Sequence, residues 1–236
     1  MPDQLQRTSL IPVSDPEAGL KITEIFCSLQ GESSSAGAIT TFVRLTGCPL
    51  RCIYCDTPYA FSGGARHSLD WIIDQVSALD AKQVCVTGGE PLAQPNALPL
   101  LKQLCDAGFQ VSLETAGALS IERVDPRVRC VVDFKCPSSG ESDQNLLINL
   151  THLKPNDELK FVISTREDYE WSQNFINQHP ECRKVSAIWF SPVFDSNTDQ
   201  IPAIARDLAQ WMLDDRSAAR LGLQIHKLLW KDAEGR

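Results

Sequence analysis

The sequence has no long apolar run, no excess of positive charge and no internal repeat. No stretch of its 236 residues approaches the roughly 20 apolar residues of a membrane-spanning helix, so no membrane partner is expected. The 22 basic and 30 acidic residues leave a net charge of −8, which argues against a nucleic-acid-binding surface. The stretch from Met1 to Arg7 has no basic segment followed by an apolar one, so we expect no secretory signal.

A secreted disulfide framework is not indicated either, because nine cysteines with three of them clustered are typical of a metal site in a reducing compartment. Hydrophobic content of 43% and charged content of 22% are those of a globular protein, and the length allows one large α/β domain. We therefore expect a cytoplasmic protein with a polar tail over residues 1–19 and a single domain over residues 20–236.

The clustered cysteines are Cys48, Cys52 and Cys55, spaced C-x3-C-x2-C on one short loop. Three thiolates do not complete the four ligands of a closed zinc site. They can hold three irons of a 4Fe-4S cluster and leave the fourth iron open for another ligand. Tyr54 precedes the last cysteine, where an aromatic ring can cover the open side. A partial zinc site, or three unrelated buried cysteines, is the alternative interpretation.

Apolar strands that alternate with amphipathic helices predict a mainly parallel sheet. The count falls short of a closed barrel, so we predict a partial, open (β/α) barrel with the cysteine loop at the end of a strand, where parallel α/β proteins carry their chemistry. An edge strand is expected at 21–28, and further strands near 40–46, 83–87, 109–115, 129–135, 159–164, 185–190 and 221–225. Helices are expected near 68–79, 95–107, 143–153, 167–178 and 202–213.

Polar groups follow other strand ends. Gly88-Gly89-Glu90-Pro91 has two glycines that let the backbone approach a ligand, although an ordinary tight turn is the alternative. Asp133-Phe134-Lys135 ends another strand with a cation and a carboxylate. Ser112 and Glu114, two residues apart on one strand, face the same side and either bind a ligand or serve as structural polar residues.

The cysteine loop closely resembles that of the radical S-adenosylmethionine (SAM) superfamily, and Gly88-Gly89-Glu90 resembles its GGE motif. The resemblance implies that the open iron binds SAM, that reductive cleavage of SAM supplies a 5′-deoxyadenosyl radical, and that an electron donor such as flavodoxin is needed. In this reading Gly89 and Glu90 lie near the SAM ammonium. The implied SAM site consists of Tyr54, Gly89, Glu90, Ser112, Glu114, Asp133, Phe134 and Lys135.

Three more motifs narrow the resemblance. Leu29-Gln30-Gly31-Glu32 precedes the cysteine loop, Asp56-Thr57 follows it, and Gln224-Ile225-His226-Lys227 lies near the end. Over residues 21–230 this combination resembles the 7-carboxy-7-deazaguanine synthase family. The resemblance implies a homodimer that rearranges 6-carboxy-5,6,7,8-tetrahydropterin to 7-carboxy-7-deazaguanine with loss of ammonia, using SAM, a 4Fe-4S cluster and Mg²⁺, in queuosine and deazapurine biosynthesis.

The same resemblance implies a substrate site. Arg44 would hold the pterin carboxylate, because a planar guanidinium suits a carboxylate. Thr57 would place its hydroxyl on Mg²⁺, a cation that prefers oxygen, although it could instead cap the turn after Cys55. His226 and Lys227 would either hold the pterin or lie at a subunit contact. The implied pterin contacts are Leu29, Gln30, Gly31, Arg44 and Thr87, with His226 and Lys227 as candidates.

The chain departs from the family pattern at two places. Ser33 stands where the family often has glycine, and Asp133-Phe134-Lys135 replaces a Ser-Pro-Lys found in some members. Two other functions are compatible with the cysteine loop. One is another small radical SAM enzyme, such as a glycyl-radical activase, and the other is a non-catalytic iron–sulfur or metal-binding scaffold.

Overall fold

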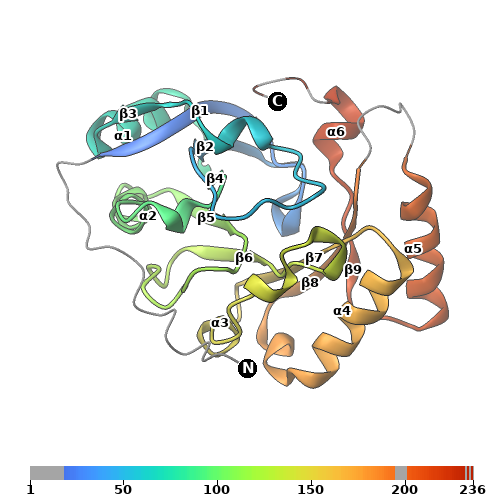
Figure 1. The fold of residues 1–236 in the computed structure, drawn as a ribbon. Helices are drawn as coiled ribbons and strands as arrows, with labels where there is room; N and C mark the ends of the chain where they lie inside the picture. Colours follow the sequence, from blue (N-terminus) through green and yellow to red (C-terminus); the bar gives the residue numbers. More distant parts are fainter. Residues whose placement is uncertain (1–18, 195–200, 232, 234, 236) are drawn as a thin grey trace.

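A computed structural model describes residues 19–194, 201–231, 233 and 235. These residues form a curved nine-stranded sheet with helices along its outer face (Figure 1). The strand order is β3-β1-β2-β4-β5-β6-β7-β8-β9, which leaves β3 and β9 at the two edges. The strands are β1 (Leu20–Leu29), β2 (Ile39–Leu45), β3 (Ala65–His67), β4 (Gln83–Gly88), β5 (Gln110–Thr115), β6 (Arg129–Asp133), β7 (Glu158–Ile163), β8 (Ala187–Pro192) and β9 (Arg220–Leu221).

Every neighbouring pair from β2 to β9 is parallel, and only β1 runs antiparallel to its two neighbours. The predicted open, mainly parallel sheet is therefore confirmed. The helices are α1 (Leu69–Ala78), α2 (Ala97–Asp106), α3 (Asn149–His152), α4 (Arg166–Gln178), α5 (Ala203–Asp214) and α6 (Ile225–Trp230). Helix α1 begins where the sequence predicts, because the Ser68 side chain accepts a hydrogen bond from Trp71 N. In the described part of the chain, no helix has the length and apolarity to cross a membrane.

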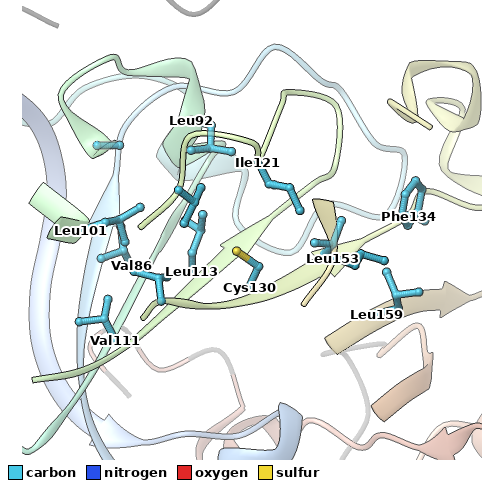
Figure 2. Close-up of a cluster of buried hydrophobic side chains, with 14 of the residues drawn as sticks. Val86, Leu92, Leu101, Val111, Leu113, Ile121, Cys130, Phe134, Leu153 and Leu159 are labelled. Carbon is cyan, nitrogen blue, oxygen red and sulfur yellow. The ribbon is translucent and has the colours of Figure 1, made fainter. Parts of the chain in front are cut away.

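The main hydrophobic core lies between the sheet and the outer helices. Successive side chains of a strand point to opposite faces, so Val84 and Val86 of β4 join this core while Thr87 faces inward. Figure 2 shows the core residues of neighbouring strands side by side, Val86 next to Leu113 and then Cys130. The inner face of the same strands is left for polar residues.

Three predicted elements differ in the structure. Strand β1 is not an edge strand, because the short β3 pairs with it at residues 20–22. Most of the helix predicted at 143–153 is irregular, with only α3 and one 3₁₀ turn at Ser142–Gln144. The last strand ends at Leu221, and Ile225, predicted to be its final residue, begins α6 instead.

The predicted tail over residues 1–19 lies outside the described residues except for Gly19. This glycine is buried and has φ +62, and a β-carbon there would lie 2.3 Å from the His67 carbonyl oxygen. Its missing side chain lets the chain enter β1 directly against β3.

Candidate active site

A cavity on the inner face is walled by the carboxyl ends of the parallel strands, the cysteine loop and the start of α6. Most of the residues predicted for cluster, SAM, metal and pterin meet there, although they come from segments far apart in the sequence. The predicted residues that line this cavity are Leu29, Gln30, Arg44, Cys48, Cys52, Tyr54, Cys55, Thr57, Thr87, Gly89, Glu114, Asp133, Lys135 and His226.

The cysteine loop is held by hydrogen bonds from the protein itself. Gly47 N donates to the Ala60 carbonyl at 2.7 Å, and Ile53 N donates to the Ser139 carbonyl at 3.0 Å. The Arg51 guanidinium donates to the Cys48 carbonyl at 2.7 Å. These contacts shape the loop around the cavity.

Cys48, Cys52 and Cys55 are free and half-buried, and all three line the cavity. Burial raises the pKa of the Cys48 thiol to about 11 and also raises the pKa of Cys52 and Cys55. Among the described residues, no three His, Cys, Asp or Glu side chains converge as ligands of a single metal ion. Three thiols on one cavity wall are the ligands that a 4Fe-4S cluster with one open iron requires.

The two glycines of the GGE motif are required by packing between strand ends. A β-carbon on Gly88 would lie 2.2 Å from the Leu45 carbonyl oxygen, and one on Gly89 would lie 2.1 Å from that of Gly47. Gly89 N donates to Leu45 at 3.0 Å, and Glu90 N donates to Gly47 at 2.8 Å. The motif thus joins the end of β4 to the cysteine loop, while Gly89 also faces the cavity.

Glu90 lies behind the cavity wall and is fully buried. Its carboxylate accepts hydrogen bonds from Thr115 Oγ1 at 2.9 Å, from Ala116 N at 2.7 Å and from Leu92 N at 3.0 Å. Burial raises the pKa of this carboxyl although these donors oppose the shift. Glu90 thus links the end of β4 to the end of β5 by hydrogen bonds. Its contact with SAM stays a prediction.

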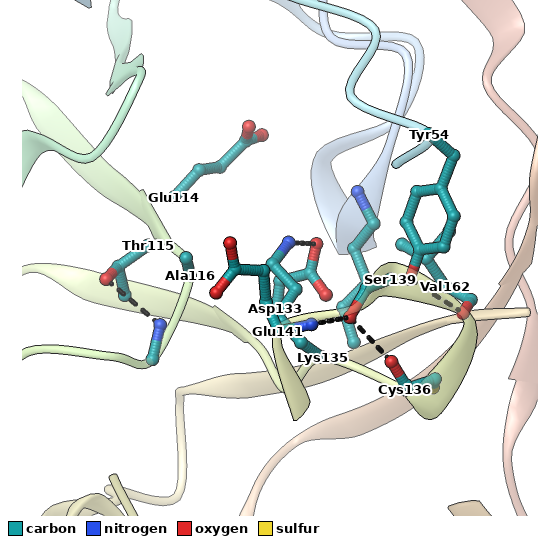
Figure 3. A network of polar contacts seen from close by, with 12 residues as sticks. Tyr54, Glu114, Thr115, Ala116, Asp133, Lys135, Cys136, Ser139, Glu141 and Val162 are labelled. Atoms are coloured by element: carbon teal, nitrogen blue, oxygen red, sulfur yellow. Dashed lines mark hydrogen bonds and ion pairs between the residues drawn. The ribbon is translucent and has the colours of Figure 1, made fainter. Parts of the chain in front are cut away.

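Asp133 and Lys135 form an ion pair on the cavity wall, with Nζ 2.9 Å from Oδ2 (Figure 3). The other carboxylate oxygen of Asp133 is buried and has no hydrogen-bond partner. Burial lowers the pKa of Lys135, but Asp133 and Cys52 outweigh it and raise the pKa above its ordinary value. Tyr54 also lines the cavity, and its hydroxyl donates to the Val162 carbonyl at 3.5 Å (Figure 3).

Phe134 points the opposite way. It is fully buried and packs against Phe161 and Phe175, with ring centroids 6.3 and 5.2 Å away. Its side chain therefore belongs to the outer core, and only its backbone is near the predicted SAM site.

Glu114 lines the cavity, but Ser112 lies deeper and outside its lining. The Ser112 hydroxyl donates to the Val84 carbonyl at 3.4 Å, a structural contact. Glu114 accepts a hydrogen bond from Thr87 Oγ1 at 3.1 Å. Burial, followed by the negative charge of Glu32, raises the pKa of Glu114.

Arg44 is oriented by groups around it. Its Nε donates to Glu24 at 2.6 Å, and its guanidinium lies 6.0 and 5.8 Å from the ring centroids of Phe26 and Tyr59. Burial lowers the pKa of Arg44, but Tyr59 and Glu24 more than offset it. A charged, pre-oriented guanidinium therefore stands on the cavity wall.

Gly31 lies beside α6 rather than on the cavity wall. A β-carbon there would lie 1.9 Å from His226 Nδ1, and Ile225 N donates to the Gly31 carbonyl at 3.0 Å. These contacts bring His226 into the cavity beside Leu29 and Gln30. Burial lowers the pKa of His226 although two nearby carboxylates oppose the shift.

Thr57 lines the cavity, and its hydroxyl donates to Asp56 Oδ1 at 2.7 Å. It precedes a 3₁₀ turn at Pro58–Phe61 but makes no side-chain cap to it. Lys227 lies behind the cavity wall with Nζ 3.4 Å from Asp56 Oδ2. Burial alone would raise the pKa of Asp56. The positive charge of Lys227 and the hydrogen bond from Thr57 outweigh burial, so the pKa lies below its ordinary value.

Several known proteins resemble this chain in sequence. Residues 42–130 match the model of the radical SAM superfamily. The 7-carboxy-7-deazaguanine synthase of Koribacter versatilis is 45% identical over 219 residues, covering 89% of this chain and 97% of that protein. The 7-carboxy-7-deazaguanine synthase of Chlorobaculum tepidum is 46% identical over 224 residues, covering 93% and 98%. The chain belongs to the 7-carboxy-7-deazaguanine synthase family.

A solved structure shares the fold of this radical SAM enzyme. The crystal structure of QueE from Escherichia coli covers 95% of this chain and 99% of its own, with a TM-score of 0.72 at 22% sequence identity. Membership of the 7-carboxy-7-deazaguanine synthase family implies a 4Fe-4S cluster and SAM. The residues fit both groups, because three free thiols line the cavity and Asp133 presents a buried carboxylate oxygen with no hydrogen-bond partner.

Four polar residues of this synthase were not assigned a role from sequence. Glu32 and Lys160 form an ion pair on the cavity wall. Gln224 donates to Glu32 at 2.7 Å and to Asp56 at 3.3 Å. Lys160 had a recognisable signal, because a charge between the apolar residues of β7 must face inward. Glu32 and Asp56 had a weaker signal, because their partners Lys160, Gln224 and Lys227 come from segments more than a hundred residues away.

Proposed function

We propose that this chain converts 6-carboxy-5,6,7,8-tetrahydropterin to 7-carboxy-7-deazaguanine with loss of ammonia. The observation that carries the proposal is that one cavity contains the three cluster cysteines, the Asp133–Lys135 pair and the pre-oriented Arg44. When bound and reduced, the cluster and SAM supply a radical that abstracts hydrogen. The remaining chemistry depends on how this chain holds and orients the pterin.

Charge and hydrogen bonding on the wall suit the two expected ligands. The Lys135 ammonium would pair with the SAM carboxylate, and the unpartnered oxygen of Asp133 would accept a hydrogen bond from a ribose hydroxyl. Arg44, held at Nε by Glu24, would bind the pterin carboxylate. Gln30 and His226 also line the cavity, from the loop after β1 and the start of α6.

Magnesium is the third proposed cofactor. Thr57 is a neutral ligand, and no three His, Cys, Asp or Glu side chains among the described residues converge on one ion. Mg²⁺ would therefore be held mainly by the bound pterin, with Thr57 and waters completing its octahedral shell. Because the Thr57 hydroxyl donates its hydrogen to Asp56, its oxygen lone pairs would be available to bind the ion.

The Thr57→Val substitution tests this role, because valine keeps the shape of threonine but removes the oxygen. We expect iron content and SAM binding to be unchanged, while turnover falls and loses most of its dependence on Mg²⁺. An unchanged Mg²⁺ response in a fully iron-loaded variant would remove Thr57 from the metal site.

The reaction itself is tested by mass spectrometry of products formed by the reduced, iron-reconstituted protein from the carboxylated pterin. We expect 7-carboxy-7-deazaguanine, and we expect deuterium abstracted from a labelled pterin to be recovered in SAM, because SAM is regenerated. Absence of product would contradict the assignment and favour another radical SAM reaction, such as activation of a glycyl-radical enzyme. The matched control, Cys52→Ala, removes one predicted iron ligand and should be inactive.

Three further properties are part of this proposal. A one-electron donor such as flavodoxin would reduce the cluster, and two copies of the chain would form a homodimer. A reducing cytoplasmic location is supported by the nine free thiols.

A further inference from the structure

The loop after β1 carries the predicted pterin contacts and is conformationally strained. Gln30 and Glu32 line the cavity. The loop closes on itself through Gln30 N to Ala38 O at 2.8 Å and Gly37 N to Gln30 O at 2.7 Å. Between them Ser33 has φ +64, a left-handed conformation that a serine adopts only when its surroundings impose it.

A buried carboxylate beneath the cavity provides that constraint. Glu158, the first residue of β7, is fully buried and lies outside the cavity lining. Its Oε2 accepts hydrogen bonds from Ser34 N at 3.0 Å and from Trp189 Nε1 at 2.5 Å. The residue next to the strained Ser33 is thus fixed by its backbone to the inner face of the barrel.

Arg129 makes a second connection to the same loop. Its Nε lies 3.5 Å from Glu158 Oε1, and its Nη2 donates to the Ser35 hydroxyl. Neither Arg129 Nε nor Glu158 Oε1 has a hydrogen-bond partner, so each of these two buried atoms is compensated by the ion pair between them. Glu158 therefore holds residue 34 directly and residue 35 through Arg129.

We propose that Glu158 is a positioning residue for the pterin, which fixes the loop of Gln30 and Glu32 through Ser34 and Arg129. The inference rests on the proposed function for the identity of the ligand. Lys160, two residues further along β7, contacts the Glu32 side chain from the cavity wall. Glu158 contacts the loop through the Ser34 backbone and through Arg129 and lies outside the cavity lining, so its effect on the pterin is transmitted by the loop.

The Glu158→Gln substitution tests this role. A carboxylate has two acceptor oxygens, whereas an amide has one oxygen and an NH₂ group that cannot accept. The variant can keep Ser34 and Trp189 or satisfy Arg129, but not both. We expect KM for the pterin to rise about tenfold, the cost of one hydrogen bond to a charged group, with kcat changed less than about twofold.

The second readout needs no turnover. In hydrogen–deuterium exchange of the iron-reconstituted variant, the peptide covering residues 30–38 should exchange faster, because the loop loses either its bond from Ser34 N to residue 158 or its connection through Arg129. Binding of SAM, whose proposed contacts lie on other elements, should be unchanged. The control is Glu170→Gln, which makes the same chemical change to an exposed ion pair of α4 and should alter neither readout.

Because Glu158 is buried, Glu158→Gln could also act by disturbing the fold. A second variant separates that effect from the proposed one. Ser35→Ala leaves Glu158 in place and removes the contact of Arg129 with the loop. We expect faster exchange of the same peptide and a rise in KM of about fivefold. An unchanged KM and unchanged exchange in both variants would overturn the inference, as would equal losses of SAM and pterin binding. Failure of the parent enzyme to turn over the pterin would instead contradict the proposed function. Hydrogen–deuterium exchange of residues 30–38 would still test whether Glu158 holds the loop.

Discussion

At the scale of single residues, Ser33 carries backbone strain that the sequence does not reveal. The sequence leaves the conformation of this loop open, and in the structure Ser33 has φ +64. A non-glycine residue in this region costs roughly 1 kcal/mol. Contacts to the two following serines hold the strained backbone in place.

Replacing Ser33 with glycine should therefore stabilise the protein. We expect the free energy of unfolding to rise by about 1 kcal/mol in urea denaturation, because glycine adopts positive φ without strain. The control is Ser62→Gly, at an exposed position with φ −147 where glycine relieves nothing. Equal effects of the two substitutions would contradict the presence of strain at Ser33.

Some side chains of the site could be predicted from the sequence and others could not. The three cysteines, Asp133 and Lys135 were predictable because a motif or a strand end marks them. Phe134 was assigned by position in a triplet, yet strand alternation sends its side chain outward. For Glu90, the motif does not reveal that the donors of Leu92, Thr115 and Ala116 already surround its carboxylate.

At the scale of elements, α6 was the least predictable part of the fold. Its six residues carry little helical periodicity, and the sequence favoured a strand ending at Ile225. What decides its conformation is non-local, because Ile225 N meets the carbonyl of Gly31 and Gln224 meets Glu32. By contrast α1, α2, α4 and α5 were found within two residues of their predicted bounds or better, since each packs an apolar face on the sheet.

The contact between α6 and the loop after β1 predicts the effect of Gly31→Ala. The added methyl group would collide with the His226 ring, so we expect loss of stability and weaker pterin binding. All three nearest atoms belong to His226, so in a His226→Ala background the same substitution should cost little. Thermal unfolding of the four proteins of this double-mutant cycle provides the measurement, and an equal cost in both backgrounds would contradict the collision.

The Lys160–Glu32 pair joins β7 to the same loop and makes a pH-dependent prediction. Burial raises the pKa of Glu32, but Lys160, His226 and Gln224 bring it below its ordinary value. Its contribution to stability is therefore present at neutral pH and lost as the pH falls through the lowered pKa. Lys160→Met should cost about 3 kcal/mol at pH 7, because it leaves a buried charge unpaired.

In that variant the pKa of Glu32 should rise, so that protonation removes the unpaired charge and the deficit shrinks as the pH is lowered towards about 5. Urea unfolding of wild type and variant at both pH values measures this change. The double variant Lys160→Met, Glu32→Gln should recover part of the stability at pH 7. A deficit independent of pH would show that the pair contributes by packing alone.

At the scale of the whole molecule, stability and chemistry lie on opposite faces of one sheet. The main core packs between the strands and the outer helices, whereas the cysteine loop is held by hydrogen bonds on the inner side. We therefore expect anaerobic removal of iron by a chelator to leave the far-UV circular dichroism unchanged and to lower the melting temperature by only a few degrees. Collapse of the helical signal would mean that the fold depends on the metal centre.

The strict alternation along the strands has a further consequence for how this chain tolerates changes of length. In β5, Leu113 packs in the outer core and Glu114 faces the cavity. Deleting a single residue before them within the strand would exchange the two sides, burying a carboxylate among aliphatic groups and placing leucine at the substrate. One missing residue would thus disable core and cavity together, whereas a conservative substitution at either position affects only one. Insertions and deletions should accordingly be accepted in the connections between elements and rejected throughout β4 to β8.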